Sequence, residues 1–96
     1  MIRTPAEIIS KDNIGINEAL VMYCHEWQKE KNIPPGNITH RTDWIMKANR
    51  IGQEITKERY NLNMTIWAYH PDRTQYDLIN LAAEIFQKTG PLGKLL

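Results

Sequence analysis

Residues 44–55 read WIMKANRIGQEI, a stretch in which apolar residues recur every three or four positions. At about 100° per residue, one set of them falls on a single side of an α-helix: Trp44, Ala48, Ile51 and Ile55. Gly52 borders this stripe, so a neighbouring segment can approach the backbone closely there. The pattern predicts a long amphipathic helix at about residues 40–60.

The same helical period extends to both sides of this stretch. Upstream, residues 16–31 place Ile16, Leu20, Tyr23 and Trp27 on one stripe, with Cys24 beside it. Downstream, residues 74–89 give a broad apolar arc that contains Leu78, Ala82, Ile85 and Phe86. These three stripes are the predicted core.

Helix boundaries are marked by capping residues. Thr4 with Glu7, and Thr74 with Asp77, have the spacing of capping boxes, and Pro5 suits the first helical position. A short first helix is therefore expected at about residues 4–10. Gly90 is expected to end the last helix, and the apolar tail 92–96 to fold back or dock.

The segment 62–70 has two readings. Leu62, Met64, Ile66 and Ala68 alternate with other residues, which is a strand-like period, but an isolated strand has no partner in a helical chain. A helical turn also fits, with Leu62, Ile66 and Tyr69 in register, and helix is the favoured reading. The sequence predicts an all-α fold, a small bundle of about four helices with an extended or helical segment at 62–70.

Size and composition indicate one helical domain over residues 1–96. The chain has 96 residues and a net charge of +1, which gives no long-range attraction to nucleic acid or anionic lipid. Its single cysteine, Cys24, excludes an intrachain disulfide. No stretch resembles a membrane span or a signal peptide, so no membrane association and a cytoplasmic location are expected.

No catalytic, cofactor or metal site is predicted. Cys24 and His25 are neighbours, and neighbours on a helix point about 100° apart, which does not suit a nucleophile and its base. The three histidines, His25, His40 and His70, match no local metal spacing. The carboxylate pairs Glu26/Glu30 and Glu54/Glu58 lie among basic residues, which favours solvated salt bridges. The chain is therefore not expected to be an enzyme.

Nucleic-acid binding by a helical regulator is an alternative function. The helix at 40–60 carries several basic residues: Arg41, Lys47, Arg50, Lys57 and Arg59. Asp43, Glu54 and Glu58 share the face of Lys47, Arg50 and Lys57, so that face is nearly neutral. Because phosphate neutralisation dominates affinity, this pattern disfavours nucleic acid as the partner.

Residues 69–73 read YHPDR, and AAEIF follows at 82–86. This segment resembles the His-Pro-Asp turn of J-domain co-chaperones, which stimulate Hsp70 ATPases. The resemblance implies chaperone contact through His70, Pro71 and Asp72. That family has a basic helix before the turn, whereas Arg59 is the only basic residue among residues 59–69. The alternative is mechanical, since Pro71 restricts His70 and Asp72 or Thr74 can cap the next helix.

The favoured function is a small protein-interaction module, an inhibitor or adaptor that acts by steric binding to a host protein. Tryptophan, tyrosine and methionine are enriched at interfaces, and they are abundant here. The predicted partner-binding residues are Trp67, Tyr69, His70, Asp72, Arg73, Tyr60 and Met46. A homodimer is a second expected form of assembly. Small domains of this kind are typical of phage or mobile-element host-takeover and anti-defence factors.

Overall fold

The computed structural model describes residues 2–93, which contain five α-helices and no strand. The helices are α1 (Pro5–Asp12), α2 (Ile16–Glu30), α3 (Thr39–Tyr60), α4 (Met64–Ala68) and α5 (Gln75–Thr89). The predicted all-α class is confirmed, and the four predicted helices lie close to their expected bounds. The additional helix, α4, occupies the segment for which strand and helix were both considered.

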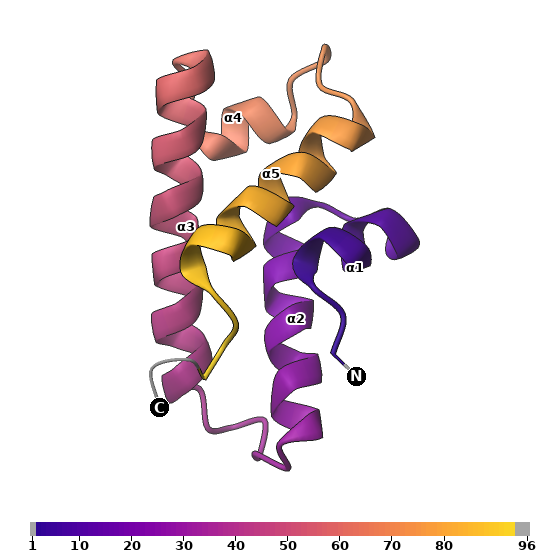
Figure 1. The fold of residues 1–96 in the computed structure, drawn as a ribbon, viewed down its shortest axis with the longest axis vertical. Helices are drawn as coiled ribbons and strands as arrows, with labels where there is room; N and C mark the ends of the chain where they lie inside the picture. Colours follow the sequence, from indigo (N-terminus) through magenta and orange to yellow (C-terminus); the bar gives the residue numbers. More distant parts are fainter. Residues whose placement is uncertain (1, 94–96) are drawn as a thin grey trace.

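The helices form two layers. The two longest, α2 and α3, run antiparallel along the long axis of a molecule that measures 40 × 24 × 21 Å. The shorter α5 crosses in front of them and packs on α3 and α1, and α1 also packs on α2 (Figure 1). The fifth helix, α4, lies against the C-terminal half of α3, at the opposite end of the molecule from the α2–α3 connection.

The predicted capping residues begin both α1 and α5. The Thr4 hydroxyl accepts a hydrogen bond from the Glu7 amide at 3.3 Å, and the Glu7 carboxylate accepts one from the Thr4 amide at 3.0 Å. Thr74 and Asp77 exchange the equivalent bonds at 3.0 and 3.1 Å. Helix α1 ends two residues later than expected because the left-handed residue is Asn13, at φ 54°.

The core contains most of the three predicted stripes. Its buried apolar side chains come from all five helices and the C-terminal segment: Ile8, Ile9, Ile16, Ala19, Leu20, Tyr23, Cys24, Trp27, Trp44, Ala48, Ile55, Met64, Trp67, Ala68, Leu78, Leu81, Ala82, Ile85 and Leu92. Ile51 and Phe86, which were expected in the core, are partly buried at its edge. The short α1 contributes Ile8 and Ile9, both fully buried.

Three aromatic rings meet where α2, α3 and α5 converge. Tyr23 lies 4.9 Å from Trp44 and 5.2 Å from Phe86, measured between ring centroids. The Trp44 indole donates a hydrogen bond to the Gly90 carbonyl at 2.9 Å, and the Leu92 amide donates one to the Tyr23 hydroxyl at 2.9 Å. The chain therefore turns back at Gly90, as predicted, and buries Leu92; residues 94–96 of the predicted tail lie outside the described residues.

Helix α4 is seated on α3 by contacts that are distant in sequence. The Asn63 side chain caps it, and the Gln53 side-chain oxygen accepts a hydrogen bond from the Met64 amide at 2.8 Å. A Cβ atom at Gly52 would come within 2.9 Å of the Ile85 side chain and closer still to the Met64 sulfur. The close approach expected at Gly52 is thus realised by Met64 and Ile85.

Two clusters of charged groups connect helices at the surface. The Arg3 guanidinium bridges Glu26 on α2, at 2.6 Å, and Asp12 at the end of α1, at 3.1 Å. Arg59 on α3 makes two 3.0 Å hydrogen bonds to the Glu84 carboxylate on α5. Within residues 2–93, none of the helices combines the length and the apolar character that a bilayer crossing requires.

Candidate functional site

The structure corrects one residue of the predicted partner-binding set. Trp67 is only 5% exposed and belongs to the core, so it is not available to a partner. The reason is the register of α4, which turns Met64, Trp67 and Ala68 inward. The Trp67 ring stacks on Tyr60 of α3, with centroids 5.1 Å apart and planes 15° from parallel.

The outer face of α4 carries the largest apolar side chains that this register leaves in solvent. Ile66 is 54% exposed and Tyr69, which caps the helix, is 77% exposed; Thr65, which precedes Ile66, is also exposed. No residue from 62 to 69 is charged. We call Thr65, Ile66 and Tyr69 the α4 face. Of the predicted residues, Tyr69 belongs to it, whereas Ile66 was not among them.

The turn after α4 is held by its own polar groups. The Asp72 amide donates to the His70 ring at 3.2 Å, and the Arg73 amide donates to the His70 carbonyl at 3.1 Å. The Arg73 side chain donates to the carbonyls of Ala68 and Thr74, which ties the end of α4 to the start of α5. The His-Pro-Asp tripeptide therefore serves as a helix connector, and the helix before it is a five-residue segment without a basic residue.

The remaining predicted residues do not all lie together. Tyr60 is 41% exposed and borders α4 through its stack on Trp67. Met46 is 65% exposed, but it lies about 20 Å from Tyr60 along the axis of α3. It is therefore not part of the same surface.

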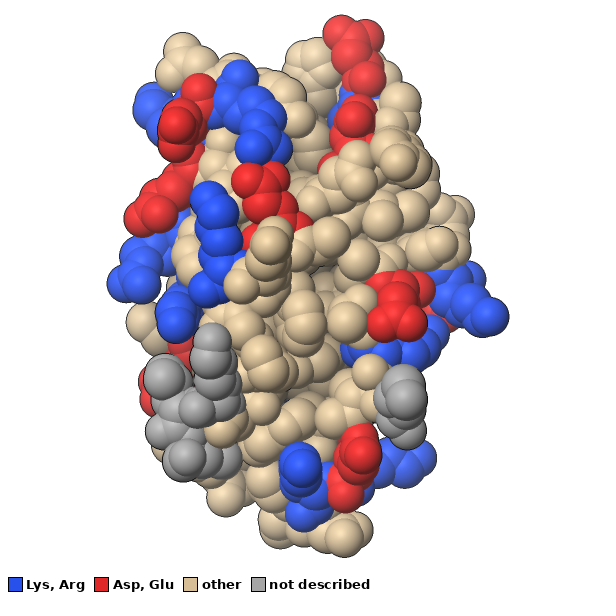
Figure 2. Space-filling view, in the orientation of Figure 1, with Lys and Arg blue, Asp and Glu red and all other residues tan. Residues whose placement is uncertain are grey.

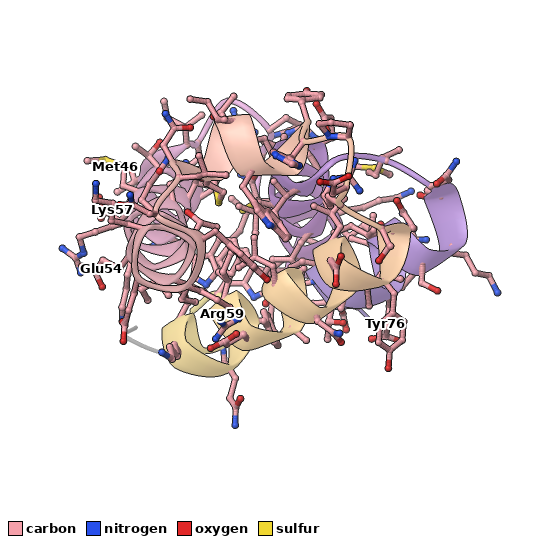
Figure 3. All side chains as sticks on the ribbon, turned by 90° about the horizontal axis from the view of Figure 1, so that it is seen from above. Met46, Glu54, Lys57, Arg59 and Tyr76 are labelled. Atoms are coloured by element: carbon pink, nitrogen blue, oxygen red, sulfur yellow. The ribbon has the colours of Figure 1, made fainter. Side chains whose placement is uncertain are left out.

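Tyr76 is an exposed aromatic residue that the sequence analysis did not single out. It is 71% exposed at the start of α5 and points away from the side of the molecule on which Met46 lies (Figure 3). Its position, about 160° around the helix from Leu78, is the signal that identifies it as exposed. Leu78 lines a hollow together with Tyr69, so Tyr76, on nearly the opposite side of α5, projects away from Tyr69.

A small hollow continues the α4 face onto the first turn of α2. It has a volume of about 40 Å³ and lies between Tyr69 and Thr65 on one side and Asn17 and Glu18 on the other. The hollow is therefore shared by the end of α4 and the start of α2.

Charged side chains of both signs are mixed on one face of the molecule. Lysines and arginines alternate with acidic residues over the face seen in Figure 2. Arg59, one of the basic residues considered for nucleic-acid contact, is paired with Glu84, which lowers the pKa of that carboxyl below its ordinary value. This distribution offers no continuous track for a phosphate backbone on that face.

The side chains considered for a catalytic or metal site, Cys24, His25 and Glu26, lie in different environments. Cys24 is fully buried, and burial raises the pKa of its thiol to about 12, so the thiolate is scarce at neutral pH. His25 lies on the exposed side of α2, and Glu26 is engaged by Arg3. Among residues 2–93, no three His, Cys, Asp or Glu side chains are arranged to hold a metal ion.

Comparisons with protein-family models, with curated proteins and with solved structures find no match to this chain.

Proposed function

We propose that the protein is a small protein-interaction module that binds another protein through the α4 face. The observation that carries this proposal is the exposure of Ile66 and Tyr69 on a short helix without charge. An isoleucine and a tyrosine placed side by side bury a large area when covered, and tyrosine is among the residues that dominate interface energies. Tyr60, which stacks on Trp67 and is 41% exposed, adds apolar area at its border.

The α4 face is held rigidly, which favours binding. Met64 is buried beneath this face, and its backbone amide donates a hydrogen bond to the Gln53 side chain. Trp67, on the same helix, stacks on Tyr60. Anchors that are already ordered lose little conformational entropy on association. The His70–Arg73 turn beside them has satisfied polar groups and an exposed Asp72 carboxylate, a composition suited to the polar rim of an interface.

This arrangement supports an inhibitor or adaptor that acts by covering a surface of its partner. No catalytic step is required of it, and a compact domain with one rigid apolar face suffices for steric occupancy. A host-takeover or anti-defence role of the kind that phage and mobile-element factors have is part of this proposal.

The test uses two tyrosines with similar exposure on different surfaces. The wild-type chain and the variants Ile66→Asp, Tyr69→Ser and Tyr76→Ser are immobilised, and proteins retained from a host lysate are identified by mass spectrometry. We expect a partner that is retained by the wild type and by Tyr76→Ser but lost with Ile66→Asp and Tyr69→Ser. Circular dichroism checks that each variant keeps its helicity, since all three side chains are exposed.

A partner lost equally with Tyr76→Ser, or retained by both α4 variants, would show that the α4 face is not the binding surface. Sedimentation of the purified protein examines the homodimer separately. If the partner is a second copy, the wild type sediments as a dimer and the α4 variants as monomers.

A further inference from the structure

A cavity lies at the end of the molecule away from α4, where α2 connects to α3. Its volume is about 440 Å³, and its wall is made by the last turns of α2 and the following connection: His25, Gln28, Lys29, Asn32, Ile33 and Pro35. Sites for small molecules usually measure about 300–1,000 Å³ and are largely apolar. The cavity has this size, and most of its surface is apolar.

The connection that forms this cavity is fixed by a buried glutamine. Gln28 is 3% exposed, and its side-chain nitrogen donates to the carbonyls of Asn37 at 2.7 Å and Pro34 at 3.4 Å. Its side-chain oxygen accepts a hydrogen bond from Arg41 on α3 at 3.4 Å. A turn closed by the Asn37 amide and the Pro34 carbonyl, at 3.0 Å, completes the loop. The wall is therefore ordered before any ligand arrives.

The ionisable groups in the cavity wall favour a negative charge. Lys29 supplies an ammonium group and His25 an imidazole, one helical turn apart on the same side of α2, while no carboxylate lines the cavity. Lys29 forms no ion pair with any of residues 2–93, although it shares an adjoining hollow with Glu26 and Glu30. Glu26 is engaged by Arg3, so the ammonium group of Lys29 can still pair with a ligand.

The carbonyl end of α2 opposes an anion there less than a free helix end would. A helix C-terminus repels negative charge through its unsatisfied carbonyl groups. Here three of them accept hydrogen bonds from the connection: Trp27 from Lys31 at 3.0 Å, Gln28 from Ile33 at 2.9 Å, and Lys29 from Asn32 at 3.2 Å. The repulsion is consequently reduced.

We propose that this cavity binds a small organic carboxylate with an apolar body. The carboxylate lies at Lys29 and His25, and the hydrocarbon or aromatic body packs against Ile33 and Pro35. A single lysine beside apolar walls suits one charge on a small molecule, whereas a polyanion needs a cluster of cations. The inference does not rest on the proposed protein-interaction function, because the cavity and the α4 face lie at opposite ends of the molecule.

The experiment compares octanoate with 1-octanol, which has the same chain length but no charge. Each is titrated into the labelled protein while backbone amide shifts are followed by NMR. We expect saturable shifts around Asn32 and Ile33 with octanoate, and affinity for 1-octanol that is weaker by about tenfold. Shifts that never saturate, that centre on α4, or that are equally strong with 1-octanol would overturn the proposal.

Two charge variants test the carboxylate position, with a matched lysine as control. Lys29→Gln is expected to weaken octanoate binding by roughly three- to tenfold and to leave 1-octanol unchanged, because an exposed ion pair contributes modestly. Lys31→Gln removes an exposed lysine that lines a different hollow, beside Trp27, and should leave the octanoate affinity unchanged. Equal losses in the two variants would reject the assigned position.

His25→Glu provides a stronger test. The introduced carboxylate precedes Lys29 by one helical turn, where it pairs with the ammonium group and repels the ligand. Octanoate affinity is expected to fall by more than about tenfold. Because residue 25 is exposed on a helix, the melting temperature should stay near that of the wild type, and octanoate affinity that survives with the fold intact would contradict the proposal.

Discussion

Two groups of aromatic rings hold this molecule together in different ways. The core aromatic cluster, Tyr23, Trp44 and Phe86, joins three helices, and two of its polar tips bind the returning chain at Gly90 and Leu92. The edge aromatic pair, Tyr60 and Trp67, joins only α3 and α4, and Tyr60 stays 41% exposed. The first arrangement fixes the whole fold, whereas the second fixes one short helix.

This difference shows that ring stacking alone does not determine how much an aromatic residue contributes to the stability of the fold. Tyr23 and Trp44 bring together segments from opposite ends of the chain, so their loss affects every helix they connect. Trp67 is as buried as they are, but the segment it secures has only five helical residues. We therefore expect global effects from the core aromatic cluster and local effects from the edge aromatic pair.

Trp44→Ala is expected to have the largest effect. It leaves a cavity beside Tyr23 and Phe86 and frees the Gly90 carbonyl, so the free energy of unfolding should fall by about 3–5 kcal/mol. Urea unfolding followed by circular dichroism measures this loss. A decrease below about 1 kcal/mol would mean that the core aromatic cluster does not hold the fold together.

Trp67→Ala is expected to cost less, about 2–4 kcal/mol, because α4 can detach while the other helices stay packed. Hydrogen exchange should speed up at the α4 amides well before it does at those of α2. Tyr60→Ala serves as the comparison, since this ring is partly exposed and its loss should cost about 1 kcal/mol. Uniform acceleration across all helices would contradict the local role of the edge aromatic pair.

Gly52→Ala tests the seat of α4 on α3. Alanine favours the helix by about 1 kcal/mol, but its methyl group would meet Met64 and Ile85, both buried. We expect a net destabilisation of about 1–2 kcal/mol, measured by thermal unfolding. A more stable variant would show that Met64 can move aside without cost.

Tyr23→Phe isolates the polar part of the core aromatic cluster. The ring stays, but the buried Leu92 amide loses its acceptor, which should cost about 1 kcal/mol. Burial raises the pKa of the Tyr23 hydroxyl, so it remains protonated through neutral pH. Hydrogen exchange of the Leu92 amide should be faster in the variant than in the wild type. An unchanged exchange rate would show that this hydrogen bond does not stabilise the fold.

The smallest expected effect concerns pH near the edge aromatic pair. Arg59 holds the pKa of the Glu84 carboxyl below its ordinary value, so the ion pair stabilises the fold above that ordinary value and is lost as pH falls through the lowered one. The pair is partly exposed, and its contribution should be roughly 0.5 kcal/mol or less. An NMR titration of Glu84 in the Arg59→Gln variant should give a pKa nearer the ordinary value.

The features that could be predicted from the sequence are those with local causes. Capping at Thr4 and Thr74 depends on a partner three residues away, and the long stripes repeat over several turns. Which side of α4 faces the core is determined instead by contacts with α3, at Gln53, Gly52 and Tyr60. Five helical residues are also too few for a period to show which side faces inward, and Trp67 was therefore misplaced.

The candidate surfaces were predictable to a smaller extent. Tyr69, a predicted partner-binding residue, is exposed, but exposed Ile66 was not predicted, because the side of α4 that faces solvent could not be derived from so short a helix. The cavity at the α2–α3 connection could not be foreseen, because the role of Gln28 depends on where the chain returns at Pro34 and Asn37. A glutamine at the margin of an apolar stripe carries no signal of such distant partners.

The single cysteine has a practical consequence. Cys24 is fully buried, and burial raises the pKa of its thiol to about 12. A disulfide reagent added at mildly alkaline pH can therefore react only when the molecule opens far enough to release α2 from the core. The rate of Cys24 modification therefore measures how often the molecule opens, without any engineered label. Comparing this rate between core variants and α4 variants shows which of them promote the opening.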